Sequence, residues 1–108
     1  MTPNIFNQSV TVQMSHCMEL LCSKGKEYAP GVDRLAAFKK AAALQGQTQA
    51  QAALGMLTKH LVSVIDMIQS GERYSPAKWD EKIGDSINYL LIIRAIIMEE
   101  DHACDTSK

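Results

Sequence analysis

Two acidic residues in the segment WDEKIGDSINY could hold a metal ion. Glu81 and Asp85 stand one helical turn apart, and carboxylates at this spacing can share a hard cation such as Mg²⁺. Asp66 is a third candidate ligand if a neighbouring helix brings it close. The same spacing is common on solvated helices, where Lys78 and Lys82 would neutralise the carboxylates. Spacing alone therefore favours a solvated surface over a magnesium site.

A second polar strip occupies the segment KHLVSVID, residues 59–66. Lys59, Ser63 and Asp66 share one side of a helix, but apolar residues flank them and leave the strip narrow. This pattern indicates a helix that is covered on more than one side. His60 lies among the flanking apolar residues, which favours a partly buried structural histidine over a ligand contact.

The elements that must position these strips are predicted to be four helices. Asp33 is a candidate cap for the second helix, Thr48 and Gln51 have capping-box spacing, and Ser75 precedes a first-turn proline. Gly46 and Gly71 can end the second and third helices. The sequence predicts one all-α, four-helix bundle-like domain over residues 1–108, with a frayed C-terminal tail. The predicted helices span 9–24, 33–45, 48–70 and 76–100.

Apolar periodicity assigns a core stripe to the second, third and fourth helices. In the fourth helix the run YLLIIRAIIM is apolar almost all round and too short to span a membrane, so we expect a homo-oligomer formed through this helix. Arg94 in this run requires a partner carboxylate or an interface, or extends to the edge of the bundle. The predicted core residues are Leu35, Phe38, Ala42 and Leu44, then Leu54, Leu57, Leu61, Val64, Ile65 and Ile68, then Trp79, Ile83, Ile87, Leu90 and Ile97.

Composition excludes several classes of partner. Lys and Arg number 11 against 12 Asp and Glu, so no overall attraction to nucleic acid or to a membrane surface is expected. Cys17, Cys22 and Cys104 lack the spacing of a zinc site or a disulfide framework, which favours free thiols, and Cys17 and Cys22 are expected in the core. The first residues lack the pattern of a signal peptide. We therefore expect a cytoplasmic protein, in a bacterial host if a phage encodes it.

Four segments carry a resemblance to a known family. They are KEY at 26–28, DRLAAF at 33–38, KHLVSVID at 59–66 and WDEKIGDSINYLL at 79–91. In these segments the chain resembles the phage- and prophage-associated nucleotide modification associated domain, over about residues 20 to 100. More distantly, it is similar to the all-α MazG-like nucleoside triphosphate pyrophosphatases.

MazG-like enzymes carry one ExxE and one ExxD motif, whose carboxylates bind the Mg²⁺ that polarises a nucleotide triphosphate. Here Glu81 and Asp85 are four residues apart instead of three, and Lys59 and His60 stand where acids are expected. This exchange favours direct contact with phosphate over hydrolysis. The resemblance thus implies cations on phosphates and aromatic rings on a base. The candidate ligand-binding residues are Lys24, Tyr28, Arg34, Lys39, Lys59, His60, Ser63, Asp85, Asn88 and Tyr89.

Three functions follow as hypotheses. The leading one is a small phage-type protein that binds a nucleotide, or a cyclic or modified nucleotide signal, without a cofactor and without hydrolysis, as a sponge against bacterial defence. The alternative is a Mg²⁺-dependent nucleotide pyrophosphohydrolase, with Asp66, Glu81 and Asp85 as the metal ligands. The third is a structural helical protein, whose polar strips form interhelical salt bridges and whose fourth helix binds a partner.

Overall fold

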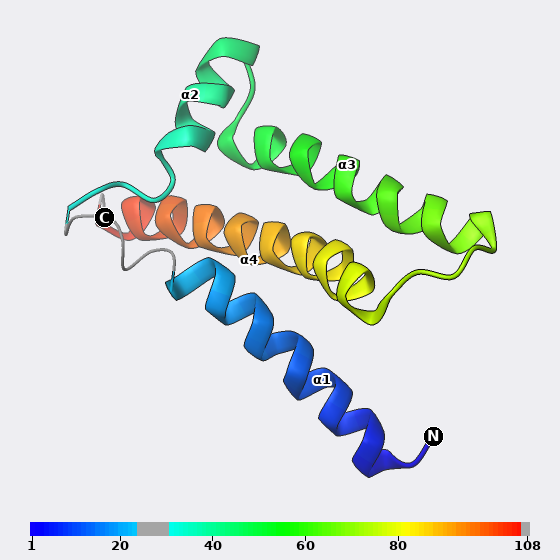
Figure 1. Cartoon of the computed structure of the whole chain (residues 1–108). Helices are drawn as coiled ribbons and strands as arrows, with labels where there is room; N and C mark the ends of the chain where they lie inside the picture. The colour runs from blue at the N-terminus through cyan, green and yellow to red at the C-terminus, as the bar shows by residue number, and fades with distance from the viewer. Residues whose placement is uncertain (24–30, 107–108) are drawn as a thin grey trace.

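The structure, a computed structural model, describes residues 1–23 and 31–106. Within these ranges the chain is all helical, which confirms the predicted fold class (Figure 1). A π-helical turn, η1 (Glu19–Ser23), continues the first helix. The α-helices are α1 (Pro3–Met18), α2 (Ala36–Gln45), α3 (Gln49–Ser70) and α4 (Pro76–Thr106).

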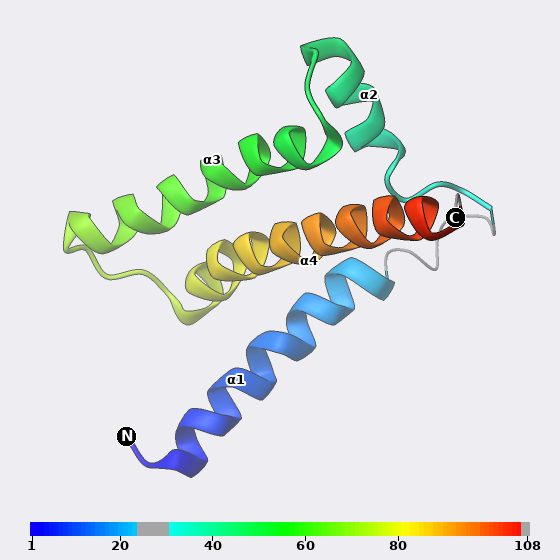
Figure 2. The same ribbon diagram turned by 180° about the vertical axis from the view of Figure 1, so that it is seen from behind.

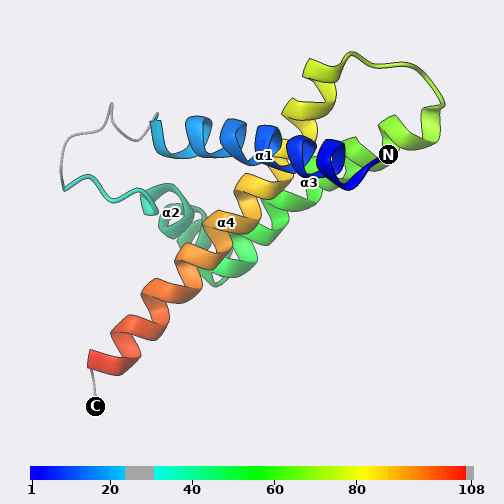
Figure 3. The same cartoon turned by 90° about the horizontal axis from the view of Figure 1, so that it is seen from below.

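The helices α3 and α4 form an antiparallel hairpin that is the centre of the molecule (Figure 2). The short helix α2 packs on the beginning of α3. A core of Leu35, Phe38, Ala53 and Ile96 joins α2, α3 and α4. On the other side of the hairpin, α1 crosses α4, and its first turns diverge from the other helices (Figures 1 and 3). None of the described helices combines the length and the apolar character needed to cross a membrane.

Local signals set the ends of the hairpin helices as the sequence predicts. The Thr48 hydroxyl accepts a hydrogen bond from the Gln51 amide at 3.1 Å, and the Gln51 side chain accepts one from the Thr48 amide at 2.9 Å. This capping box fixes the start of α3. Gly71 ends α3 with a φ of 69°, in the left-handed region that favours glycine. Ser75 then caps α4, because its hydroxyl accepts from the Lys78 amide at 3.1 Å.

Three predicted helix boundaries are wrong. The first helix begins at Pro3 instead of residue 9, because the Thr2 hydroxyl caps it by accepting from the Ile5 amide at 3.3 Å. The second begins at Ala36, because Asp33 accepts from the Leu35 amide at 2.9 Å and closes a turn before the helix starts. The fourth continues to Thr106, past the expected frayed end.

The predicted core stripes of α3 and α4 are also largely wrong. Leu57 is buried as expected, but the other members of both stripes are half-buried or exposed. The buried residues lie on adjacent faces, where Ala53 and Met67 of α3 and Ser86, Asn88 and Ile96 of α4 are covered. Half or more of the side chain is exposed at Leu54, Ile65, Ile68 and Leu90, and more than a third at Leu61, Ile83 and Ile97.

In α2 the prediction is right for three of four residues. Leu35, Phe38 and Ala42 are buried, whereas Leu44, in the last turn of α2, is 88 % exposed. Arg94 is exposed on α4, on the same outward side as Leu90 and Ile97. Exposed apolar side chains therefore lie on the outward faces of α3 and α4, whereas the seam between these two helices is partly polar.

Candidate functional site

The polar strips of α3 and α4 meet at the seam of the hairpin. His60 of α3 extends toward α4, and its Nδ1 lies 3.6 Å from Oδ2 of Asp85. The imidazole stacks on the ring of Tyr89, with centroids 4.9 Å apart and an interplanar angle of 25°. Phe38 of α2 contacts the same tyrosine edge to face, at 6.4 Å and 82°. We call His60, Asp85, Asn88 and Tyr89 the seam cluster.

Two side chains of the seam cluster, those of His60 and Asp85, are partly exposed to solvent. The side chains of His60 and Asp85 are 29 % and 31 % exposed. Water therefore reaches the pair and screens it, so its contribution to stability is small. The Asp85 carboxylate can accept hydrogen bonds, and the imidazole can donate from one or both nitrogens. The cluster thus offers a hydrogen-bond donor, an acceptor and an aromatic surface within one turn of each helix.

Asn88 gives the seam cluster an unusual feature. Its side chain is buried, and Oδ1 accepts no hydrogen bond from any residue that the structure describes. A buried carbonyl without a donor costs about 1–3 kcal/mol. Ser86, two residues earlier and equally buried, has no such deficit, because its hydroxyl donates to the Lys82 carbonyl at 3.4 Å. The oxygen is covered by the surrounding side chains, so a ligand N–H or O–H supplies the missing donor only where those side chains move aside.

Other predicted residues lie around the seam without joining it. Ser63 is half-buried one turn after His60, whereas Lys59 and Asp66 are exposed on α3. Lys59 forms no ion pair within residues 1–23 and 31–106, so its ammonium is available to an anion. Glu81 is exposed on α4, one turn before Asp85.

The three carboxylates of the enzyme hypothesis do not form one site in this chain. No three His, Cys, Asp or Glu side chains come together anywhere in the described part of the molecule. Asp85 pairs with His60, while Asp66 and Glu81 are exposed to solvent. The predicted metal set of Asp66, Glu81 and Asp85 is therefore not assembled.

The predicted cations of α2 and its preceding turn are already engaged. Lys39 contacts Asp33 at 2.6 Å and Glu99 of α4 at 2.9 Å. Its hydrogen bond to Asp33 raises the pKa of Lys39 and lowers the pKa of Asp33. Arg34 donates to the Leu21 carbonyl at 3.1 Å and lines a hollow of about 240 Å³. A phosphate at Lys39 would have to displace two carboxylates.

Two further predicted ligand residues, Lys24 and Tyr28, lie outside the described residues. Among the cysteines, Cys17 is fully buried, as expected for a core thiol, whereas Cys22 is exposed. The prediction of a core thiol is therefore wrong for Cys22, which lies in η1 beyond the point where α1 contacts α4.

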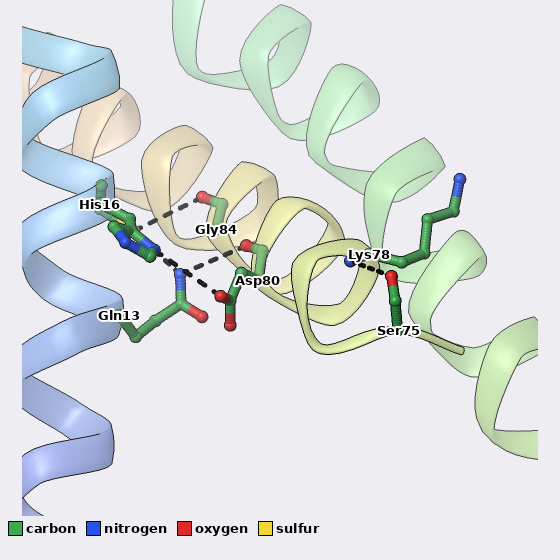
Figure 4. Close-up of polar contacts among 7 residues, drawn as sticks. Gln13, His16, Ser75, Lys78, Asp80 and Gly84 are labelled. Atoms are coloured by element: carbon green, nitrogen blue, oxygen red, sulfur yellow. Dashed lines mark hydrogen bonds and ion pairs between the residues drawn. The ribbon is translucent and has the colours of Figure 1, made fainter. Parts of the chain in front are cut away.

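Sequence reasoning missed the junction between α1 and α4, shown in Figure 4. The Gln13 amide donates to the Asp80 carbonyl at 3.3 Å, and His16 Nδ1 lies 3.7 Å from the Asp80 carboxylate (Figure 4). Gly84 permits this approach, because a Cβ there would lie 3.1 Å from the Gln13 amide nitrogen. The available signal was the isolated glycine within a helical segment, which often marks close packing.

A hollow of about 640 Å³ lies beside this junction, between α1 and the start of α4. Its lining includes Ile5, Val12, Trp79 and Ile83, so it is mainly apolar. None of the seam cluster lines it. The hollow and the seam cluster are therefore separate features.

Comparison of the chain with protein-family models, with curated proteins and with solved structures finds no match.

Proposed function

We propose that the protein binds a nucleotide or a nucleotide-derived signal at the seam cluster and retains it without hydrolysis. The observation that supports this most is the position of His60 and Tyr89 as a stacked pair beside Asn88, a buried residue whose carbonyl lacks a donor. Nucleobases combine a flat π-surface with N–H donors at the edge, so a base that stacks on the pair and displaces the side chains over Asn88 satisfies both features.

In this proposal each residue contacts a different part of the ligand. The base stacks on the aromatic pair and donates an N–H to Asn88, which removes the cost of its buried carbonyl. Asp85 accepts from the base or from a ribose hydroxyl. Lys59, the exposed residue directly before His60, contacts a phosphate oxygen by a charge-assisted hydrogen bond.

The donor set supports retention rather than cleavage. In MazG-like chemistry several carboxylates hold the Mg²⁺ that activates the phosphate chain. Asp85 is the acidic member of the seam cluster, and the imidazole of His60 contacts it. With the resemblance to phage-associated nucleotide domains, this favours a protein that sequesters a nucleotide signal of bacterial defence.

Retention can be tested directly with a panel of nucleoside triphosphates, monophosphates and cyclic nucleotides. The protein is incubated with each compound with and without Mg²⁺, freed of unbound ligand, denatured and assayed by mass spectrometry. Recovery of one intact compound supports the proposal. Recovery of a monophosphate with pyrophosphate supports the enzyme instead, and recovery of nothing contradicts both.

A matched pair of variants locates the phosphate. Lys59→Met should weaken retention roughly 10- to 100-fold, since hydrogen bonds to charged groups contribute about 1.5–3 kcal/mol. Lys40→Met removes an equally exposed lysine from α2 and should leave retention unchanged. Equal retention by the two variants would exclude Lys59 from the site.

A further inference from the structure

Helix α1 has the composition of an interface although the chain leaves it uncovered. Pro3–Met18 contains no Asp, Glu, Lys or Arg. Solvated helices present a charged face, whereas the cores of protein interfaces are depleted of charged residues. Six large apolar side chains of α1 are more than a third exposed: Ile5, Phe6, Val10, Val12, Met14 and Met18.

The composition of α1 gives it little intrinsic helical stability, so the helix depends on packing. Valine, threonine, asparagine and serine, which favour helices weakly, make up much of its 16 residues. Isolated alanine-rich helices become marginal in water below about 12–15 residues, so a 16-residue helix of weaker helix formers is close to that limit. Only Cys17 of α1 is buried, and its polar contacts to α4 come from Gln13, His16 and Cys17, in its last two turns. The first turns therefore receive little packing from the chain itself and gain stability if another surface covers them.

The accessible surface area of the chain is large enough for a second protein chain to bind to it. Its accessible area is 8005 Å². A compact monomer of 11.9 kDa is expected to expose only about 6,000 Å². The radius of gyration is 16.6 Å, against about 13 Å for a compact chain of this length. The excess of about 2,000 Å² is more than the roughly 800 Å² that each partner buries in a stable complex.

A second copy of the chain fits this surface better than a partner of different chemistry. The hollow between α1 and α4 is apolar where Ile5, Val12 and Ile83 line it, and a second hollow lies between Val10 and Ile87. A helix that lacks Asp, Glu, Lys and Arg and exposes apolar side chains matches both hollows, and α1 itself is such a helix. In a dimer with a two-fold axis the same surface of each copy faces the other copy. Helix α1 can therefore line the hollows of its own chain and also pack against those of the partner.

We infer that two copies associate through α1, and that each copy places its α1 against the α1–α4 groove of the other. The groove is the set of residues lining the two hollows, with Ile5, Val10, Val12, Trp79 and Ile83 as its main members. This interface lies across α4 from the seam cluster and does not depend on nucleotide binding. Association then stabilises α1 by covering its apolar side chains.

Sedimentation velocity of the full chain tests the inference. The wild type is expected at twice 11.9 kDa. Val10→Asp places a charge in the interface and should give single chains, because a buried unpaired carboxylate is costly. Leu44→Asp adds the same charge at a residue that is 88 % exposed on α2, so it should remain a dimer.

Fluorescence of Trp79 supplies a second readout that needs no variant. It is the single tryptophan of the chain and lines the groove. On dilution its emission should shift to the red as the mass falls from two copies to one. A wild type that sediments as one copy at all concentrations overturns the inference. So does a Val10→Asp variant that stays dimeric, and so does a dimer that dissociates without a change in Trp79 emission.

Discussion

Replacing Asn88 by leucine should stabilise the free protein and abolish nucleotide retention. The side chain is 9 % exposed, and Oδ1 has no donor among the described residues. Removing an unsatisfied buried carbonyl recovers about 1–3 kcal/mol. Leucine is close to asparagine in shape and adds buried apolar surface, while its extra volume costs up to a similar amount. We expect a net gain of about 1 kcal/mol, or a rise in Tm of roughly 4–8 °C.

Thermal denaturation with and without the retained nucleotide separates the two effects. A ligand present at 100 times its Kd stabilises the native state by about 2.7 kcal/mol. The wild type should gain this increment, whereas Asn88→Leu should gain none although it starts from a higher Tm. Protein concentration is held constant, because the Tm of an associating protein depends on it.

Ser86→Ala is the control for this experiment. Ser86 is as buried as Asn88, but its hydroxyl is satisfied by the Lys82 carbonyl. Its removal should change stability little and leave the nucleotide increment intact. A lower Tm for Asn88→Leu would show that the carbonyl has a stabilising partner. An unchanged nucleotide increment in Asn88→Leu would exclude this residue from the binding site.

Three further predictions concern the fold. Thr48→Ala removes the capping box of α3 and should cost about 1 kcal/mol, seen as a lower Tm, whereas Thr48→Ser should retain it. Gly84→Leu should push α1 away from α4, since even a Cβ would meet the Gln13 side chain; faster hydrogen exchange of the α1 amides would report this, and unchanged exchange would contradict it. Asp33 has a pKa below its ordinary value of 3.8, so its contribution to stability is present above that pH and lost as the pH falls through the lowered pKa. Lys39 has a pKa above its ordinary value of 10.5, so its contribution is present below that pH and lost on the alkaline side. Asp33→Asn should remove the part of the stability that is lost in acid. If the Tm of the variant depends on pH in the same way as that of the wild type, Asp33 does not make this contribution.

Helix ends were predictable where a short segment carries its own signal. Thr48 with Gln51, Ser75 with Pro76, and Gly71 each act within one turn, and each boundary is confirmed. The predicted start of the first helix at residue 9 is wrong because residues 9–12 alternate like a strand, whereas Thr2 and Pro3 carry the cap and the first-turn proline that begin α1. Both signals are local, so this helix start could be predicted without knowledge of the tertiary packing.

The buried faces were not predictable, because each long helix carries two stripes with helical spacing. In α3 the inward stripe comprises Ala53, Leu57, His60, Val64 and Met67, and the outward one Leu54, Leu61, Ile65 and Ile68. The inward stripe repeats at intervals of three and four residues and the outward one at seven, four and three, so periodicity marks both as packing surfaces. It does not distinguish the stripe that meets α4 from the stripe that is exposed in the chain. The sequence alone did not predict the seam cluster, because Asp85 and Tyr89 lie opposite His60 of the inward stripe only through the packing of α4 on α3.

The location of the nucleotide is the central claim, and amide chemical shifts measured by NMR test it most directly. The ¹⁵N-labelled wild type is titrated with the nucleotide that the panel recovers. The largest shifts should fall at His60, Asp85, Asn88 and Tyr89, with a smaller change at Lys59. Shifts concentrated at Val12, Trp79 and Ile83 would place the ligand in the α1–α4 groove and contradict the account.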